Sequence, residues 1–258
     1  MDQWIVGCTT RPYNELSYGE ALARIGEAGY EHAALFAHQG VLPIRSDCTS
    51  AEVSQVRRAA ADAGVASSMV LGRTQLDGGL DQAIDDYLRL IDNVAEIGAR
   101  WLLDLGTSKE AHYEAYFQLM SRAALHAEEV GVHITMKPHG GISLTTEHLL
   151  EAVRRVGHPA FAISYDPGNI IYYTAGDRRP GDDIVDIAPN VSTLIVKDCI
   201  IEDGKPDVMV TPGGGLVDFG LVWRQLCAGG FSGPSYVECV ARGEANQVGR
   251  HLIHTLGF

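Results

Sequence analysis

Short apolar or β-branched runs alternate with longer segments whose apolar residues recur every three or four positions, from one end of the chain to the other. The short runs have the length of buried strands, and the longer segments have the periodicity of amphipathic helices. Several helical segments stop at a glycine, as at Gly64, Gly98 and Gly131, and glycine is a common helix terminator. The pattern predicts a series of strand-helix units.

Eight such units can be followed along the chain. The predicted strands are Trp4–Cys8, His32–Phe36, Ala66–Leu71, Trp101–Leu105, His133–Met136, Phe161–Tyr165, Val191–Val196 and Ser235–Cys239. The predicted helices are Tyr18–Ala28, Thr49–Ala63, Leu80–Ile97, Lys109–Val130, Thr146–Val156, Asp182–Ala188, Phe219–Ala228 and Ala245–Leu256. Eight alternating units in 258 residues, with no linker rich in Ser or Pro, favour an α/β fold of the single (β/α)₈ TIM-barrel type over an open sheet. We expect one domain over residues 1–258.

Composition and charge narrow the range of partners. The chain is 46% hydrophobic and 21% charged, which is ordinary for a globular protein. Twenty Lys and Arg against 33 Asp and Glu give a net charge of −13, which repels a phosphate backbone, so we expect no nucleic-acid partner.

Nothing in the sequence indicates a membrane or an oxidising compartment. The amino terminus has no basic region followed by an apolar stretch, and no run approaches the roughly 18 apolar residues of a membrane span. The five cysteines are scattered and form no paired motif: Cys8, Cys48, Cys199, Cys227 and Cys239. We expect a cytoplasmic protein.

Polar residues that follow the apolar runs are the candidates for chemistry, because TIM-barrel active sites lie at the carboxyl ends of the strands. They are Lys137 to Gly141 after the fifth strand, Asp166 to Asn169 after the sixth, Lys197-Asp198 after the seventh, and Glu238 within the eighth. Alternation along the fifth strand places Thr135, Lys137 and His139 in one phase.

These candidates also have structural interpretations. Asp166 starts a turn-forming tetrapeptide, and Lys197-Asp198 is equally well a solvated pair. Glu238 lies inside an apolar strand, where an ionised carboxylate is rarely buried without a partner, and is the strongest site candidate.

Three further residues stand where they could contact substrate. Arg11 and Arg242 follow the first and last strands and could hold an anionic group, and His38 follows the second strand. The segment from Cys199 to Leu216 is either a lid or phosphate-binding loop or a plain solvent loop.

The motifs at these positions resemble the xylose-isomerase-like TIM-barrel superfamily, the sugar phosphate isomerase/epimerase group that also contains class II apurinic endonucleases. The motifs are Gly29-Tyr30-Glu31, Asp166-Pro167-Gly168-Asn169, Val196-Lys197-Asp198, Pro212-Gly213-Gly214-Gly215 with Val217-Asp218-Phe219, and Gly230-Phe231-Ser232-Gly233-Pro234 leading to Glu238. The resemblance covers essentially the whole chain.

The resemblance implies a divalent metal held by Glu, Asp, His and Glu from the fifth to eighth strands. Asp166 and Glu238 match two of these positions. The positions that differ are Lys137 for the fifth-strand Glu, Ile195 for the seventh-strand His, Ala34 for a second-strand Glu, and Asn169 for a His that often follows the Asp. Asn169 is accordingly a candidate for substrate contact.

Two arrangements of the altered site are open. In the first, His139 joins Asp166 and Glu238 to bind Mn, Fe, Co, Zn or Mg, and Lys137 orients the substrate. In the second, the ammonium groups of Lys137 and Lys197 fill the metal position, neutralise the two carboxylates and polarise a substrate carbonyl.

The resemblance implies an isomerase or epimerase acting on a small sugar, ketose or polyol ketone through an enediolate. Glu238 is then the base, Lys137 or His139 relays a proton, and a metal or Lys197 stabilises the oxyanion. The alternatives are a lyase or dehydratase using the same enediolate, and a sugar-binding barrel without activity. An endonuclease is disfavoured by the missing ligands and the charge. The sequence leaves a homo-oligomer open.

Overall fold

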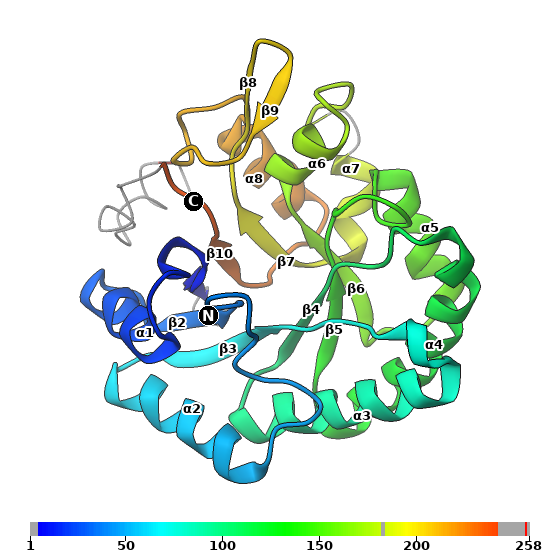
Figure 1. Ribbon diagram of the computed structural model, residues 1–258. Helices are drawn as coiled ribbons and strands as arrows, with labels where there is room; N and C mark the ends of the chain where they lie inside the picture. Colours follow the sequence, from blue (N-terminus) through cyan, green and yellow to red (C-terminus); the bar gives the residue numbers. More distant parts are fainter. Residues whose placement is uncertain (1–4, 182–183, 242–255, 257–258) are drawn as a thin grey trace.

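The strands close into a barrel in the computed structural model, which describes residues 5–181, 184–241 and 256 (Figure 1). Its parallel strands are β1 Val6–Thr9, β2 His32–Leu35, β3 Ala66–Leu71, β4 Trp101–Asp104, β5 His133–Met136, β6 Phe161–Tyr165, β7 Val191–Val196 and β10 Ser235–Val237. Around the barrel the order is β1-β10-β7-β6-β5-β4-β3-β2. The predicted TIM-barrel fold is confirmed.

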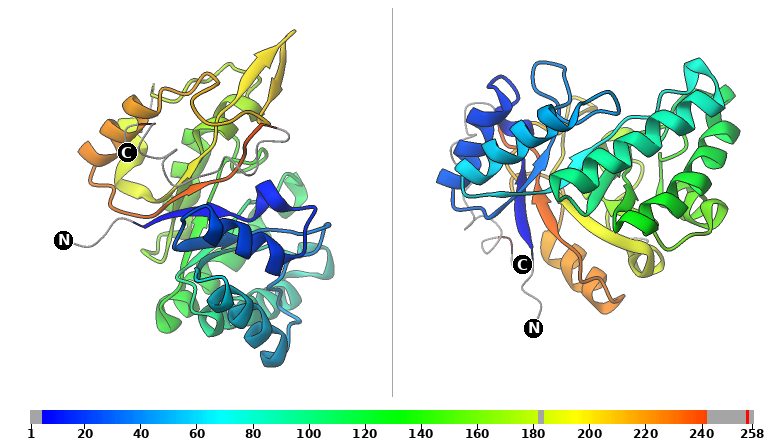
Figure 2. Two further views of the ribbon diagram at one scale, coloured as in Figure 1. Left: turned by 90° about the vertical axis from the view of Figure 1, so that its left-hand side faces the viewer. Right: turned by 90° about the horizontal axis from the view of Figure 1, so that it is seen from below.

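The long helices lie outside the strands, as the two further views show (Figure 2). The helices are α1 Tyr18–Glu27, α2 Ser50–Asp62, α3 Leu80–Ile97, α4 Tyr113–Val130, α5 Thr146–Val156, α6 Pro167–Tyr173, α7 Ile184–Ile187 and α8 Phe219–Ala228. Capping boxes at Ser17 and Thr49 start α1 and α2, and left-handed Gly98 and Gly131 end α3 and α4. The predicted helix Ala245–Leu256 lies outside the described residues except for residue 256. Among the described residues, no helix is long and apolar enough to span a membrane.

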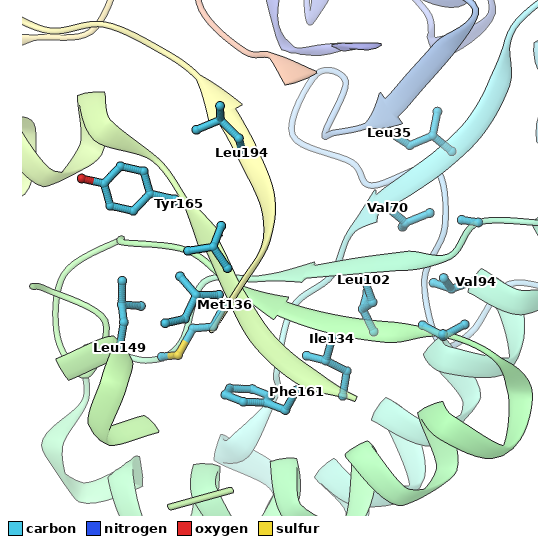
Figure 3. Close-up of a cluster of buried hydrophobic side chains, with 14 of the residues drawn as sticks. Leu35, Val70, Val94, Leu102, Ile134, Met136, Leu149, Phe161, Tyr165 and Leu194 are labelled. Carbon is cyan, nitrogen blue, oxygen red and sulfur yellow. The ribbon is translucent and has the colours of Figure 1, made fainter. Parts of the chain in front are cut away.

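Alternation along the strands divides the core into two layers. Outward-facing residues such as Leu35, Val70 and Leu102 pack against helix residues such as Val94 of α3 (Figure 3). A separate apolar cluster contains the residues of the opposite phase, among them Ala34, Met69, Leu103, Ile195 and Tyr236. Residues of this second phase fill the barrel interior, and the same inward-facing phase continues to the carboxyl ends of the strands at the mouth of the barrel.

The segment after β7 contains a hairpin, which the sequence analysis did not predict. Strand β8, Ile200–Glu202, pairs antiparallel with β9, Lys205–Asp207, and the hairpin extends away from the barrel (Figures 1 and 2). Its turn residues Asp203 and Gly204 both have positive φ, at 50° and 75°. Asp-Gly is a strong signal for such a turn, so the sequence did contain the information.

Candidate active site

Four consecutive barrel strands each place a charged residue directly after their last residue. Lys137 follows β5, Asp166 follows β6, Lys197 follows β7 and Glu238 follows β10. Parallel strands bring their carboxyl ends to one mouth of the barrel, so all four residues meet there. We call these four residues the charged cluster.

The side chains point inward because each lies two positions after an interior residue. These interior residues are Thr135, Ser164, Ile195 and Tyr236. The hydroxyls of Thr135 and Ser164 lie 3.2 and 2.8 Å from the Thr193 hydroxyl, forming a polar layer below the mouth. Strand alternation then carries the cluster residues to the same inner face.

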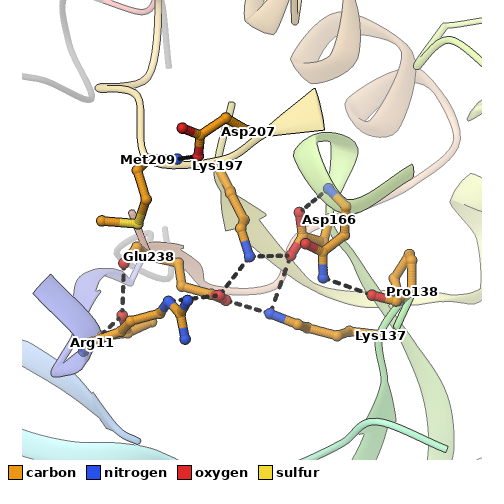
Figure 4. A network of polar contacts seen from close by, with 10 residues as sticks. Arg11, Lys137, Pro138, Asp166, Lys197, Asp207, Met209 and Glu238 are labelled. Atoms are coloured by element: carbon orange, nitrogen blue, oxygen red, sulfur yellow. Dashed lines mark hydrogen bonds and ion pairs between the residues drawn. The ribbon is translucent and has the colours of Figure 1, made fainter. Parts of the chain in front are cut away.

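Two ammonium groups interleave with two carboxylates in the charged cluster (Figure 4). Lys197 Nζ donates to Glu238 Oε1 at 2.8 Å, and Lys137 Nζ donates to Glu238 Oε2. Lys137 Nζ also lies 3.1 Å from Asp166 Oδ2, and Lys197 Nζ lies 3.9 Å from the same oxygen. Each of the four residues is at most 4% exposed. Ionised groups at such depth are tolerated only because they are paired.

The ion pairs keep Glu238 and Lys197 charged. Burial alone raises the pKa of the Glu238 carboxyl, but the ammonium groups of Lys137 and Lys197 outweigh it and hold that pKa well below its usual range. Burial alone lowers the pKa of Lys197, and the opposite charges of Glu238 and Asp166 raise it above its ordinary value.

Asp166 differs from Glu238 in its partners. Asp166 Oδ1 caps α6 by accepting the Asn169 backbone N–H at 2.8 Å, whereas Asp166 Oδ2 accepts no hydrogen bond. Burial raises the pKa of Asp166 despite the two nearby ammonium groups. Both oxygens of Glu238 accept ammonium hydrogen bonds, so Asp166 is the more basic carboxylate and the one with an oxygen that is ion-paired but accepts no hydrogen bond.

Arg11 lies on the solvent side of the cluster. It follows β1 in a short 3-10 helix, Arg11–Tyr13, and its Nε is 4.0 Å from Glu238 Oε1. Its side chain is 46% exposed, in contrast to the buried cluster below. A guanidinium at this place adds a third positive charge beside two carboxylates, and its contact with an anionic substrate group stays a prediction.

His139 faces a neighbouring pocket. Its ring packs at 4.9 Å against Tyr173, and it lines a pocket of about 290 Å³ at the carboxyl ends of β3 and β4, together with Arg73 and Ser108. Partial burial and the ammonium groups of Lys137 and Lys197 lower the pKa of the His139 imidazole to about 4. His139 is therefore neutral at pH 7.

The residues present do not fit a divalent metal. Among the described residues, no three His, Cys, Asp or Glu side chains gather as a metal site, so His139 does not complete a site with Asp166 and Glu238. The space between the carboxylates holds the ammonium nitrogens of Lys137 and Lys197 instead. Of the two arrangements left open by the sequence, the contacts match the lysine-carboxylate pairing of the second, and its role toward a substrate stays a prediction.

The other predicted substrate contacts have structural partners or lie outside the description. Asn169 is buried and its Nδ2 donates to the Pro138 carbonyl at 2.7 Å, tying the β5 and β6 loops together. His38 is buried, and its Nδ1 lies 3.0 Å from the Leu16 carbonyl oxygen. No described contact joins His38 to the cluster. Arg242 lies outside the described residues.

Two buried aspartates near the mouth organise loops. Asp198 accepts four backbone N–H bonds at 2.8–3.0 Å, from Cys199, Gly213, Gly215 and Val217. A Cβ on Gly215 would lie 2.4 Å from Asp198 Oδ1, which explains a glycine there. Asp104, at the end of β4, was not singled out from the sequence, although it stands at a strand end like the cluster residues.

Comparisons with known proteins agree with this architecture. The model of the family described as xylose isomerase-like TIM barrel matches residues 22–255. No curated protein matches the chain.

Solved structures share the fold over nearly the whole chain. A xylose isomerase-like TIM barrel protein from Mycobacterium smegmatis in complex with magnesium is 14% identical, with a TM-score of 0.78 and coverage of 98% of this chain and 97% of the other. D-Psicose 3-epimerase from Clostridium cellulolyticum H10, with D-tagatose, is 13% identical, with a TM-score of 0.73 and coverage of 96% and 91%. An AP endonuclease of family 2 from Brucella melitensis is 16% identical, with a TM-score of 0.73 and coverage of 95% and 96%. Identities this low show the fold alone.

Proposed function

Because the chain belongs to the xylose isomerase-like TIM barrel family, we propose that it is an isomerase or epimerase of a small sugar or polyol ketone that works through an enediolate. The observation that carries the proposal is the charged cluster, in which a carboxylate oxygen without a hydrogen bond lies beside two ammonium groups. The structural similarity to a D-psicose 3-epimerase supports the substrate class.

Asp166 is the proton acceptor in this proposal. Its Oδ2 accepts no hydrogen bond, and burial raises its pKa, which makes it the stronger base of the two carboxylates. Glu238, predicted from the sequence to be the base, instead positions the ammonium groups, because both of its oxygens receive their hydrogen bonds. Opposed environments for two neighbouring carboxyls are a common way to divide acid-base roles.

Lys137 and Lys197 stabilise the charge that develops on the substrate. When Asp166 Oδ2 takes the proton α to the carbonyl, the electrons of the C–H bond form a carbon–carbon double bond, and the π electrons of the carbonyl move onto its oxygen to give the enediolate. Ammonium groups already fixed beside Asp166 can donate to that oxygen without reorganisation. Isomerisation requires the proton to return to the former carbonyl carbon while the proton of the adjacent hydroxyl passes to the enediolate oxygen, so that a new carbonyl forms. Return of the proton to the opposite face of the original carbon epimerises the substrate.

The pocket beside His139 suits the rest of the substrate. Its lining includes Arg73, Thr74, Ser108 and Lys109, which offer hydroxyl and cationic donors for substrate oxygens. Neutral His139 lines this pocket and can pass a proton or hydrogen-bond a hydroxyl.

Exchange of a substrate proton with solvent tests the proposal. The protein is incubated in ²H₂O with a panel of ketoses that includes D-fructose, D-psicose, D-tagatose and L-ribulose, and deuterium at the carbon next to the carbonyl is followed by ¹H NMR. We expect incorporation with at least one ketose, together with an isomer or epimer. A folded protein that exchanges no proton across the panel would contradict the proposal, and release of a β-substituent would identify a lyase instead.

The matched variants are Asp166→Asn and Asp218→Asn. Both aspartates cap a helix through Oδ1, at α6 and α8, and asparagine also caps helices well. Only Asp166 lies in the charged cluster, so only Asp166→Asn is expected to stop exchange.

A further inference from the structure

We propose that the ammonium groups of Lys137 and Lys197 replace a divalent cation in this protein and exclude one from the charged cluster. The inference rests on the arrangement of the charges and does not depend on the proposed reaction. Lys137 is the decisive residue, because it lies between the two carboxylates.

The charge balance of the cluster leaves no place for a metal ion. Two ammonium groups and two carboxylates sum to zero, and Arg11 adds one positive charge 4.0 Å from Glu238. A divalent cation would bring the buried cluster to a net charge of +2, with the half-exposed Arg11 adding a further positive charge beside it, which is strongly unfavourable away from water.

The carboxylate oxygens are also committed elsewhere. Both oxygens of Glu238 accept ammonium hydrogen bonds, and Asp166 Oδ1 accepts the Asn169 N–H. Asp166 Oδ2 remains, and a cation bound there at about 2.0–2.6 Å would contact the Lys137 ammonium, which is 3.1 Å from that oxygen. A metal would have to displace both lysines.

Lys137 controls this exclusion more than Lys197 does. The Lys137 ammonium contacts both Asp166 and Glu238, whereas that of Lys197 is 2.8 Å from Glu238 and 3.9 Å from Asp166. Exchange of Lys137 for glutamate changes the cluster from zero to −2 and adds a third carboxylate between the first two. Three carboxylates suit Mn²⁺ or Mg²⁺.

Manganese binding to the full-length protein tests the inference without a substrate. Each protein is dialysed against chelator, titrated with Mn²⁺, and the free ion is followed by electron paramagnetic resonance. The variants are Lys137→Glu, Lys137→Gln and Lys205→Glu, the last changing the total charge equally at an exposed position on β9. Circular dichroism reports on folding.

We expect the wild type and Lys205→Glu to bind no stoichiometric Mn²⁺ and Lys137→Glu to bind about one ion per chain. Lys137→Gln, which removes the charge without adding a ligand, is expected to bind more weakly than Lys137→Glu and more tightly than the wild type. If Lys137→Glu does not fold, Mn²⁺ binding by Lys137→Gln tests the inference instead. Stoichiometric binding by the wild type that is lost in Asp166→Asn would overturn the inference. So would folded Lys137 variants that bind no better than the wild type.

Discussion

The end of β4 and the ends of β6 and β10 bury carboxylates in two different ways. Asp104 accepts hydrogen bonds from Tyr87 Oη at 2.9 Å, Tyr116 Oη at 2.7 Å and the Gly106 N–H at 2.8 Å. Asp166 and Glu238 instead face ammonium groups. All three carboxylates are almost completely buried, so depth alone does not distinguish a structural acid from a reactive one.

The groups that face each carboxylate distinguish Asp104 from Asp166 and Glu238. The three neutral donors to Asp104 are held in place by packing and by the backbone, and they leave neither carboxylate oxygen unbonded. Each lysine ammonium carries a full charge and three N–H donors, so it can donate to a substrate oxygen while it stays paired with a carboxylate. Asp104 at the β4 end lines the pocket, whereas the cluster is the part to which we assign the proposed chemistry.

The largest expected effect separates Asp166 from Asp104 by activity. Asp166→Asn removes the proposed proton acceptor and should lower the rate of solvent-proton exchange by about 10²–10⁴-fold. Asp104→Asn should change that rate only a few-fold. Initial rates by NMR, on the ketose that gives exchange, check both. Equal losses in the two variants would abolish the distinction between the sites.

The free energy of unfolding should show how strongly the cluster depends on its ion pairs. Glu238→Gln leaves two ammonium groups against one carboxylate and should lower the free energy of unfolding by about 3–5 kcal/mol. The exposed pair of Glu147 with Arg178 is the reference, and Glu147→Gln should cost less than about 1 kcal/mol.

A compensating change sharpens that measurement. Lys197→Met added to Glu238→Gln restores equal numbers of opposite charges and should recover most of the lost stability. Urea unfolding followed by circular dichroism compares the single and double variants. A double variant less stable than Glu238→Gln would show that packing, and not charge balance, governs the cluster.

Asp104→Asn should have a smaller effect on stability. An asparagine keeps one acceptor oxygen but places an NH₂ group where Tyr87 now donates, and one such mismatch costs about 1–3 kcal/mol. Asp104→Asn in a Tyr87→Phe background should cost less, because the opposed donor is gone. Unfolding free energies of the four proteins form the cycle, and an unchanged cost in both backgrounds would argue against the Tyr87 contact.

The smallest effect concerns pH and His139. The pKa of His139 is about 4 in the folded protein against an ordinary value of 6.5, so the unfolded chain binds more protons between these values. The contribution of His139 to stability is therefore present above pH 6.5 and is lost as the pH falls toward 4. His139→Gln should flatten the decline in stability over this window. Parallel curves for wild type and variant would contradict the lowered pKa.

The fold was predictable because each unit carries its own local signal. Residues that are neighbours in the sequence determine the helix ends at Gly98 and Gly131 and the capping boxes at Ser17 and Thr49. The same is true of the Asp203-Gly204 turn, which was overlooked. Asp166-Pro167-Gly168-Asn169, interpreted as a turn, starts α6 because Asp is a good helix cap and Pro suits the first turn.

The site was predictable only in part. The strand-end positions of Lys137, Asp166, Lys197 and Glu238 follow from alternation, but their pairing depends on the closed order of strands and joins residues as far apart as 101 positions. His139 shows where alternation fails. After Lys137 the chain leaves the extended conformation and turns, with the His139 N–H donating to Ser143 Oγ. The imidazole lines the pocket, and no described hydrogen bond or ion pair joins it to the cluster.

The two carboxyls of the cluster have opposite electrostatic environments, and a ¹³C NMR titration of the carboxyl carbons measures that difference. Asp166→Asn and Glu238→Gln assign the two signals in protein labelled at Asp and Glu. We expect the pKa of Asp166 to lie above the ordinary aspartate value and Glu238 to stay ionised well below the pKa of an ordinary glutamate. The reverse order, or two carboxyls that titrate together at ordinary values, would contradict this expectation.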